Sequence, residues 1–179
     1  DRQQVLCSRS FGVRVTEYHD MRAAVTHFVT RAAEKLRNQT LLAKTISVHI
    51  STSPFDDKRE YYNNAATSSL AVPSDDTREL IHIAQRLLES IYVHGHSYQR
   101  AGVLLMDLVS HRYQQQDLFT PTENPQSDEL MRTLDSINAK MGSGTLRFAG
   151  EGFAAHWRMK QQLRSPRYTT QYSELREVW

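Results

Sequence analysis

The sequence predicts an α+β domain: a four-stranded antiparallel sheet with two helices on one face, followed by a partly helical tail. Along residues 5–109, segments with strand-like and helix-like spacing of apolar residues follow the order strand, helix, strand, strand, helix, strand. This is a split β-α-β arrangement. The composition changes at residue 110, where four Gln and two Pro interrupt any periodicity up to residue 127. A compact domain at 1–109 and an appended tail therefore follow from the sequence.

The first two elements are a short strand and a basic amphipathic helix. Residues 5–12 form the strand, which is expected to end at Gly12. Asp20 is expected at the N-cap of the helix, where its side chain can accept a hydrogen bond from a free backbone N–H. Six apolar residues then recur at helical spacing: Met21, Val25, Phe28, Val29, Ala32 and Leu36. The opposite, outer face is basic and carries Arg22, His27, Arg31, Lys35 and Arg37.

The next two strands alternate between a buried and an open face. In the second strand, Leu42, Ile46, Val48 and Ile50 face the core, and Thr45, Ser47, His49 and Ser51 face outward. A turn at 53–57 follows. In the third strand, at 62–72, the inward set is Ala66, Ser68, Leu70 and Val72, and the outward set is Asn63, Ala65, Thr67 and Ser69. Such alternation is typical of a half-buried antiparallel sheet.

The second helix and the fourth strand complete the domain. Asp76 and Glu79 are spaced as in a capping box at the start of the helix. The helix continues along an apolar stripe made of Leu80, Ala84, Leu87, Leu88 and Ile91, and ends before Gly95. Residues 100–109 are apolar at nearly every position, which favours a central strand or one covered on both sides.

The rest of the chain divides in two. Residues 110–127 are expected to be a flexible linker. The tail, 128–179, begins with a short helix at 128–141 that places Leu130, Leu134 and Ile137 on one side. Glycines then interrupt an irregular segment, and the end of the chain is rich in arginine and aromatic residues.

The bulk composition excludes few functions. A net charge of +2 is only mildly basic and does not by itself indicate nucleic acid. Cys7 is the only cysteine, so it forms no internal disulfide and favours a reducing, cytoplasmic setting. The chain starts without Met or a visible signal peptide, which suggests a fragment. Its apolar runs, such as 103–106, are far too short to cross a membrane.

The uncovered face of the sheet is the first candidate site. Its expected Thr, Ser, His, Asn and Ala side chains are either simply solvated or form a saddle for a polyanion. Hydroxyl groups and strand amides permit a close approach of phosphates, and cations attract them. The cations that flank these strands are Arg9, Lys44, Arg59 and Arg100.

The second candidate is the sequence Gln115-Gln116-Asp117-Leu118-Phe119 in the linker. A Leu-Phe pair is unexpected in a polar linker. It either tucks back onto its own domain or acts as a docking peptide, with Leu118 and Phe119 as apolar anchors and Gln115 as a polar positioner.

Other motifs give no catalytic centre. His94 and His96 have metal-like spacing but lack a ligand set, and Gly142 and Gly144 lack the Lys-Ser/Thr ending of a phosphate loop. No paired carboxylates suited to two metal ions, and no arrangement suited to nucleophilic catalysis, stand out. We therefore expect no catalytic residue, no metal site and no cofactor in this chain.

Six short stretches together resemble one known family. They are Cys-Ser-Arg-Ser-Phe-Gly at 7–12, Arg-Ala-Ala-Glu-Lys-Leu-Arg at 31–37, Thr-Ser-Pro-Phe at 52–55, Tyr-Gln-Arg-Ala-Gly-Val at 98–103, Leu-Arg-Phe-Ala-Gly at 146–150 and Ser-Pro-Arg-Tyr-Thr-Thr at 165–170. They span nearly the whole chain, and in this order they resemble the C-terminal part of the UmuC family of bacterial SOS translesion DNA polymerases, which belong to the Y family.

The resemblance implies a function for each segment. Residues 1–109 would be the little finger domain, which holds template and primer DNA by the backbone. The linker would carry the sliding-clamp motif at Gln115, Leu118 and Phe119, although Gln116 and Asp117 depart from the usual pattern. The tail would meet the UmuD′ dimer and RecA. The expected DNA contacts are Ser8, Arg9, Ser10, Phe11, Gly12, Lys44, Thr45, Ser47, His49, Thr67 and Arg100.

The resemblance also implies what this part lacks. The magnesium-binding carboxylates of the family belong to a palm domain that would precede residue 1, so this chain is expected to have no polymerase activity. Two alternatives remain open at this point. One is a protein-interaction module whose sheet never touches DNA, and the other is a small hydrolase that uses His94 or His96.

Overall fold

The computed structural model describes residues 4–56, 60–111, 125–153 and 156–159, together with a few single positions nearer the end of the chain. The elements are β1 (Gln4–Val15), α1 (Tyr18–Arg37), β2 (Leu41–Thr52), β3 (Asn63–Ser74), α2 (Thr77–Ile91), β4 (Tyr98–Ser110), α3 (Pro125–Met141) and the short 3-10 helix η2 (Ala149–Glu151). This order confirms the predicted succession of strands and helices.

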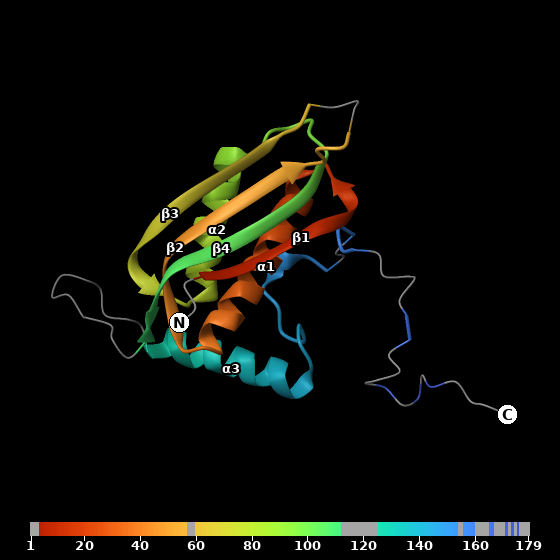
Figure 1. The fold of residues 1–179 in the computed structure, drawn as a ribbon. Helices are drawn as coiled ribbons and strands as arrows, with labels where there is room; N and C mark the ends of the chain where they lie inside the picture. Colours follow the sequence, from red (N-terminus) through yellow and green to blue (C-terminus); the bar gives the residue numbers. More distant parts are fainter. Residues whose placement is uncertain are drawn as a thin grey trace.

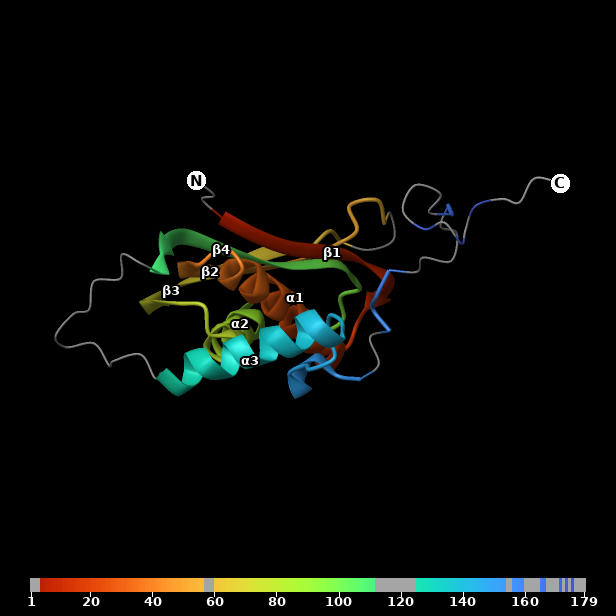
Figure 2. The ribbon, with the colours of Figure 1, turned by 90° about the horizontal axis from the view of Figure 1, so that it is seen from below.

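The four strands form one antiparallel sheet in the order β1-β4-β2-β3. β4 is therefore central, as its apolar sequence predicts. Helices α1 and α2 pack against one face of the sheet, and α3 lies on the far side of these helices (Figures 1 and 2). The predicted fold class is confirmed. No described helix has both the length and the apolar composition needed to span a membrane.

The core lies between the sheet and the two helices. Its largest fully buried side chains include Tyr98, Phe28, Met21, Leu36 and Ile46. The buried faces of β2 and β3 are the predicted ones, since Ile46, Val48, Ile50 and Leu70 belong to the core cluster. Alternation along each strand therefore leaves the Thr45, Ser47, His49 set on the uncovered face.

The two predicted helix caps differ in outcome. Asp76 caps α2 by accepting a hydrogen bond from Arg78 N at 2.8 Å. Burial alone would raise the pKa of Asp76, but hydrogen bonds from Arg78 and Ser127 outweigh burial and lower it. The Asp20 cap was wrong: α1 begins at Tyr18, so Glu17 holds the N-cap position and Asp20 lies in the first turn. An acidic residue there still interacts favourably with the helix dipole.

Several boundaries also differ from the sequence-based ones. β1 continues past Gly12 to Val15, with an irregularity after Ser10. Helix α3 begins at Pro125, inside the stretch expected to be a linker. On α3 the inward side chain is Met131, only 2% exposed, whereas Leu130 is 46% exposed. The prediction that Leu130 lies on the inward side of this helix was therefore wrong, because its neighbour Met131 takes that place.

The tail packs against α1 through three contacts that the sequence did not indicate. Arg37, expected on a solvated outer face, has a side chain only 9% exposed and forms a bidentate ion pair with Asp135 of α3, at 2.6 and 2.8 Å. Glu151 accepts from His27 Nδ1 at 2.8 Å. Trp157 joins the core cluster between Phe11 and Phe28. The helix side of the domain is therefore closed by residues of the tail.

Candidate nucleic-acid interface

The face of the sheet opposite α1 and α2 is covered by no described element (Figure 2). Residues paired in register form four rows across it, from β1 through β4 and β2 to β3. The rows are Gln4–Met106–Thr45–Ser69, Leu6–Leu104–Ser47–Thr67, Ser8–Gly102–His49–Ala65 and Ser10–Arg100–Ser51–Asn63. We call these sixteen residues the open face. Half of them carry small polar side chains, so a large polar ligand can approach the strands closely.

Position 102, in the middle of the open face, requires a glycine because the side chains of Ser8 and His49 occupy the space that a Cβ would fill. A Cβ at this position would lie 2.8 Å from His49 Nε2 and closer still to Ser8 Cβ. The His49 ring and the Ser8 side chain thus close over a glycine, and the strands keep their pairing.

His49 is half-buried and uncharged in this environment. Burial and, to a lesser degree, the charge of Arg100 lower the pKa of His49 from its ordinary value of 6.5. Its imidazole is therefore neutral at pH 7 and can donate or accept one hydrogen bond at each nitrogen. It can contact a phosphate oxygen as a neutral donor but adds no attraction through charge.

In the two rows that contain Thr45 and Ser47, the side-chain hydroxyl groups form hydrogen bonds with each other and with other groups of the sheet. Thr67 donates to Ser47 Oγ at 2.9 Å, and Ser47 donates to Ala66 O at 3.2 Å. Thr45 donates to Asp107 at 2.6 Å. These bonds orient the side chains before any ligand arrives. Because hydroxyl oxygens can accept while donating, the network remains open to further partners.

Charge on the open face is limited. Arg100 is exposed beside Ser10 and Ser51, and Lys44 is exposed where the pairing of β2 with β3 shifts. The carboxylate of Asp107 lies beside Thr45, which the sequence did not predict. The apolar side chains of Leu6, Leu104 and Met106 were also unexpected. Arg100 is therefore the cation among the sixteen residues of the open face, Lys44 lies at the pairing shift beside this face, and the centre is neutral and partly apolar.

The expected contact residues divide between the two sides of the sheet. Ser8, Ser10, Thr45, Ser47, His49, Thr67 and Arg100 share the open face. Phe11 is buried edge-on against Trp157, and Gly12 N donates to Trp157 O at 3.0 Å. Arg9 is exposed on the α1 side of β1, near Cys7. Side chains that alternate along residues 8–12 point to opposite faces of the sheet, and this alternation could have separated the two groups. It was missed because residues 7–12 were treated as one motif.

Cys7 illustrates the electrostatics of that other side. Its thiol is partly buried, and burial raises its pKa even though Lys35, Arg9 and Arg31 lower it through their charges. A neutral thiol packed on the core is a structural side chain rather than a nucleophile. The charges of Arg9, Arg31 and Lys35 thus act on this side of the sheet, together with that of Glu34.

Two further expectations can be located only in part. Gln115, Leu118 and Phe119 lie outside the described residues. His96 stacks on Tyr62 with ring centroids 4.8 Å apart, and His94 packs edge-on against Tyr92. Among the residues that the structure describes, no group of three or more His, Cys, Asp or Glu side chains is placed to hold a metal ion.

Comparison with protein families matches two segments of the chain. Residues 2–118 match the model described as the impB/mucB/samB family C-terminal domain. Residues 128–178 match a domain of unknown function, DUF4113. The first match therefore ends between β4 and α3, and the second begins within α3.

Curated relatives align along nearly the whole chain. Protein UmuC of Salmonella typhimurium is 46% identical over 178 residues, which is 99% of this chain and 42% of that protein. Protein SamB of Salmonella typhimurium is 44% identical over 175 residues, or 97% of this chain and 41% of that protein. The chain thus spans about two fifths of the length of these relatives.

Among solved structures, similarity is found with a DinB family error-prone DNA polymerase from Sulfolobus solfataricus. The TM-score is 0.49 and the identity 11%, over 60% of this chain and 30% of that one. An insertion ternary complex of Dbh DNA polymerase gives a TM-score of 0.47 and 14% identity, over 60% of this chain and 29% of the other.

Proposed function

We propose a DNA-holding function for this chain from one premise: it belongs to the impB/mucB/samB family, whose C-terminal domain it carries at residues 2–118. We propose that the open face holds primer–template DNA by its backbone, as part of a UmuC-like error-prone translesion polymerase of the Y family. The observation that supports this most directly is the open face itself, a four-strand surface of small polar side chains left uncovered by the described elements.

Holding would be independent of sequence. The open face has no protruding helix to enter a groove and read base edges. Its hydroxyl groups and the neutral His49 suit phosphate oxygens, while Arg100 and Lys44 supply attraction. With few cations, affinity should be weak and should fall with salt by about 0.9 in log–log slope for each phosphate contact.

The experiment is a titration of fluorescent duplex DNA at several salt concentrations. Replacing Arg100 and Lys44 together by Gln should make the log–log slope shallower by about 2, one unit for each lost contact. Arg9→Gln is the matched comparison, since Arg9 lies on the α1 side of β1. An unchanged slope in the double variant would sink the backbone-holding assignment and favour the interaction-module alternative, for which exposed Leu6 on the open face would be the natural anchor.

The remaining segments are proposed to dock partners. Gln115, Leu118 and Phe119 are proposed to bind a sliding clamp, and residues 128–179 to contact UmuD′ and RecA. Replacing Leu118 and Phe119 by Ala should remove clamp binding and leave DNA binding unchanged. Loss of stability in that variant would instead indicate that the pair packs on its own domain.

Catalysis is proposed to lie elsewhere in the parent protein. The magnesium ions that such a polymerase uses would be held by carboxylates of a palm domain, which this chain does not resemble. We therefore propose that this part alone transfers no nucleotide, and that the parent acts in the cytoplasm.

A further inference from the structure

Three apolar side chains on the open face have no place in the hydrophobic core. Leu6 of β1 pairs in register with Leu104 of β4, and Met106 follows two residues later on β4. Val103 and Leu105 are fully buried in the core, so alternation places the residues between and after them on the open face. Leu6 is 52% exposed, and the other two are partly exposed. We call Leu6, Leu104 and Met106 the apolar patch.

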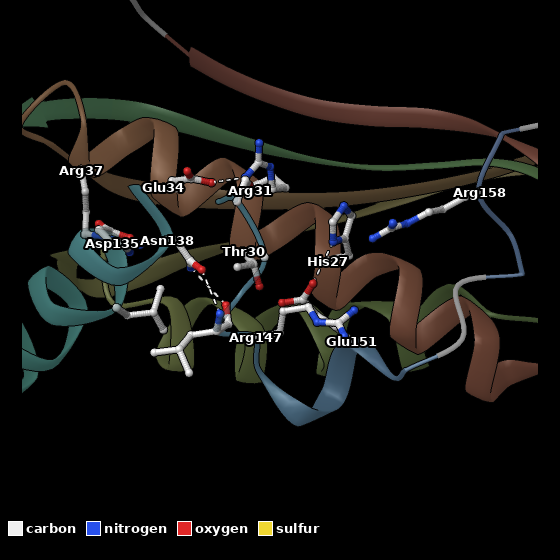
Figure 3. A pocket seen from close by; sticks show the side chains of 14 residues that line it. His27, Thr30, Arg31, Glu34, Arg37, Asp135, Asn138, Arg147, Glu151 and Arg158 are labelled. Carbon is white, nitrogen blue, oxygen red and sulfur yellow. Dashed lines mark hydrogen bonds and ion pairs between the residues drawn. The ribbon is translucent and has the colours of Figure 1, made fainter. Parts of the chain in front are cut away.

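The apolar patch differs from the helix side of the molecule, where the charged side chains satisfy one another. There, Glu34 accepts from Arg31 in the wall of a cavity between α1, α3 and the segment 143–158 (Figure 3). Glu151 accepts from His27 in the same wall. Among the described residues, by contrast, the apolar patch belongs neither to the core cluster nor to the side chains packed against it. Apolar side chains scattered singly on a surface are ordinary, whereas three that adjoin one another on a polar face indicate contact with a ligand.

Small polar groups border the apolar patch. In its two rows, β2 and β3 contribute Thr45, Ser47, Thr67 and Ser69. The next row, with Ser8, Gly102 and His49, lies roughly 7 Å farther along the strands, since each residue advances a strand by about 3.4 Å. A ligand that spans these rows meets polar and apolar groups in close succession, so it must alternate the two itself.

We infer that the apolar patch contacts sugars of the DNA backbone and makes the open face selective for deoxyribose over ribose. The inference rests on the proposed DNA-holding function and names the class of nucleic acid that the open face accepts. A DNA backbone alternates charged phosphates with sugars, and the C2′ methylene group of deoxyribose is apolar. Ribose carries a hydroxyl group there, which is both a donor and an acceptor. Against Leu6 and Leu104 that hydroxyl would lose water without gaining a partner, which costs free energy.

The hydroxyl groups nearby do not replace the water that a ribose would lose. Thr67 donates to Ser47, Ser47 donates to Ala66 O, and Thr45 donates to Asp107. These protons are therefore already used within the sheet. The hydroxyl groups also belong to β2 and β3, whereas the apolar patch belongs to β1 and β4. A ribose over the patch is left with apolar contacts.

A protein partner fits the apolar patch less well than a sugar does. A specific protein interface buries roughly 800 Å² on each partner. Three partly exposed side chains supply a small part of such an area, and polar rows border them. A sugar ring is similar in size to a leucine side chain, so the patch matches it.

The test uses the full chain at low salt and measures competition against a fluorescent DNA duplex. The competitors have one sequence and are a DNA duplex, an RNA duplex and a 2′-fluoro duplex. We expect the RNA duplex to bind about tenfold more weakly than DNA, because unpaired hydroxyl groups lose water. The 2′-fluoro duplex has the helical shape of RNA but lacks the hydroxyl group, so it should bind nearly as well as DNA.

Variants then assign the preference to the apolar patch. Replacing Leu6 and Leu104 together by Asn keeps a similar volume and supplies partners for a hydroxyl group, so the preference for DNA should fall to about twofold or less. The salt dependence should not change, because no charge is altered. Leu6→Asn alone tests the same contact at the more exposed position and should give part of the effect. Leu130→Asn, at an exposed leucine of α3, is the matched control and should keep the full preference.

Three outcomes would overturn the inference. Equal affinity for DNA and RNA duplexes would show that the sugar is not recognised. A 2′-fluoro duplex that binds as weakly as RNA would assign the preference to helical shape. Asn variants that keep the full preference would assign it to other residues and leave the apolar patch to a protein partner. The DNA-holding proposal is judged separately, by the salt dependence of the Arg100 and Lys44 variant, and survives each of these outcomes.

Discussion

The two faces of the sheet differ in what covers them. The covered face packs against α1 and α2, and the tail then closes the outside of these helices with Met131, Glu151 and Trp157. The open face keeps small hydroxyl side chains held by bonds within the sheet. The difference indicates that the described part of the tail stabilises one side of the domain and does not cover the other.

The largest expected loss of stability on the covered side of the sheet comes from replacing Trp157. Replacing it with Ala empties a site between Phe11 and Phe28 and should lower the free energy of unfolding by about 3 kcal/mol. The value lies at the low end for a buried Trp because its Nε1 has no acceptor among the described residues, so the wild-type indole already bears a cost. Urea denaturation measures the change.

Trp157→Phe is the control, since it keeps an aromatic ring and removes the unpaired N–H. It should change stability by less than about 1 kcal/mol. A chain truncated after Ser110 should still unfold cooperatively, because the stripes of α1 and α2 have a sheet to cover, but at lower urea. An Ala variant as stable as wild type would mean that the tail does not close the helix side in solution.

The ion pair between α1 and α3 comes next. Asp135→Asn should lower the free energy of unfolding by about 2 kcal/mol, because the largely covered side chain of Arg37 would lose its counter-charge. Arg37 also donates to Asp75 O and Thr77 Oγ1, both at 2.8 Å, and these bonds remain. Combining Asp135→Leu with Arg37→Met should recover part of the loss. A double-mutant cycle that gives no coupling energy between positions 37 and 135 would show that other contacts hold α3 in place.

Gly102 gives a smaller effect and tests the open face directly. Gly102→Ala should cost about 1–2 kcal/mol, because the new methyl group meets Ser8 Cβ, which is fixed to its own strand. Adding Ser8→Gly should relieve part of this cost, which thermal unfolding can measure. If Gly102→Ala is neutral, the open face is looser than its close-packed middle row implies.

The smallest expected effect is a change in how the free energy of unfolding depends on pH, and it is caused by Glu151. The pKa of Glu151 is lowered in the folded protein, so its pairing with His27 contributes stability above the ordinary value of 4.5 and loses it as the pH falls further. Urea denaturation from pH 6 to pH 3 should therefore show a shallower loss of stability in Glu151→Gln than in wild type. If the stability curves of wild type and Glu151→Gln run parallel with pH, the Glu151 carboxylate has the same pKa in the folded and unfolded protein.

Local patterns allowed the sequence by itself to determine much of this protein. Alternation predicted the outward Thr45, Ser47 and His49, helical spacing predicted the stripes of α1 and α2, and Asp76 was recognisable as a cap. Each of these features depends on residues within a few positions of one another, where backbone geometry alone decides which side chains share a face.

Only the tertiary structure decided the environment of Arg37, Phe11 and Trp157. An amphipathic helix pattern marks Arg37 as solvent-facing, and nothing near it in the sequence announces Asp135. Phe11 belongs to a motif that suggested DNA contact, yet it packs against Trp157 from the far end of the chain. Burial and ion pairing depend on which segments meet in space, and those meetings are set by the packing of the whole chain rather than by the spacing of neighbouring residues.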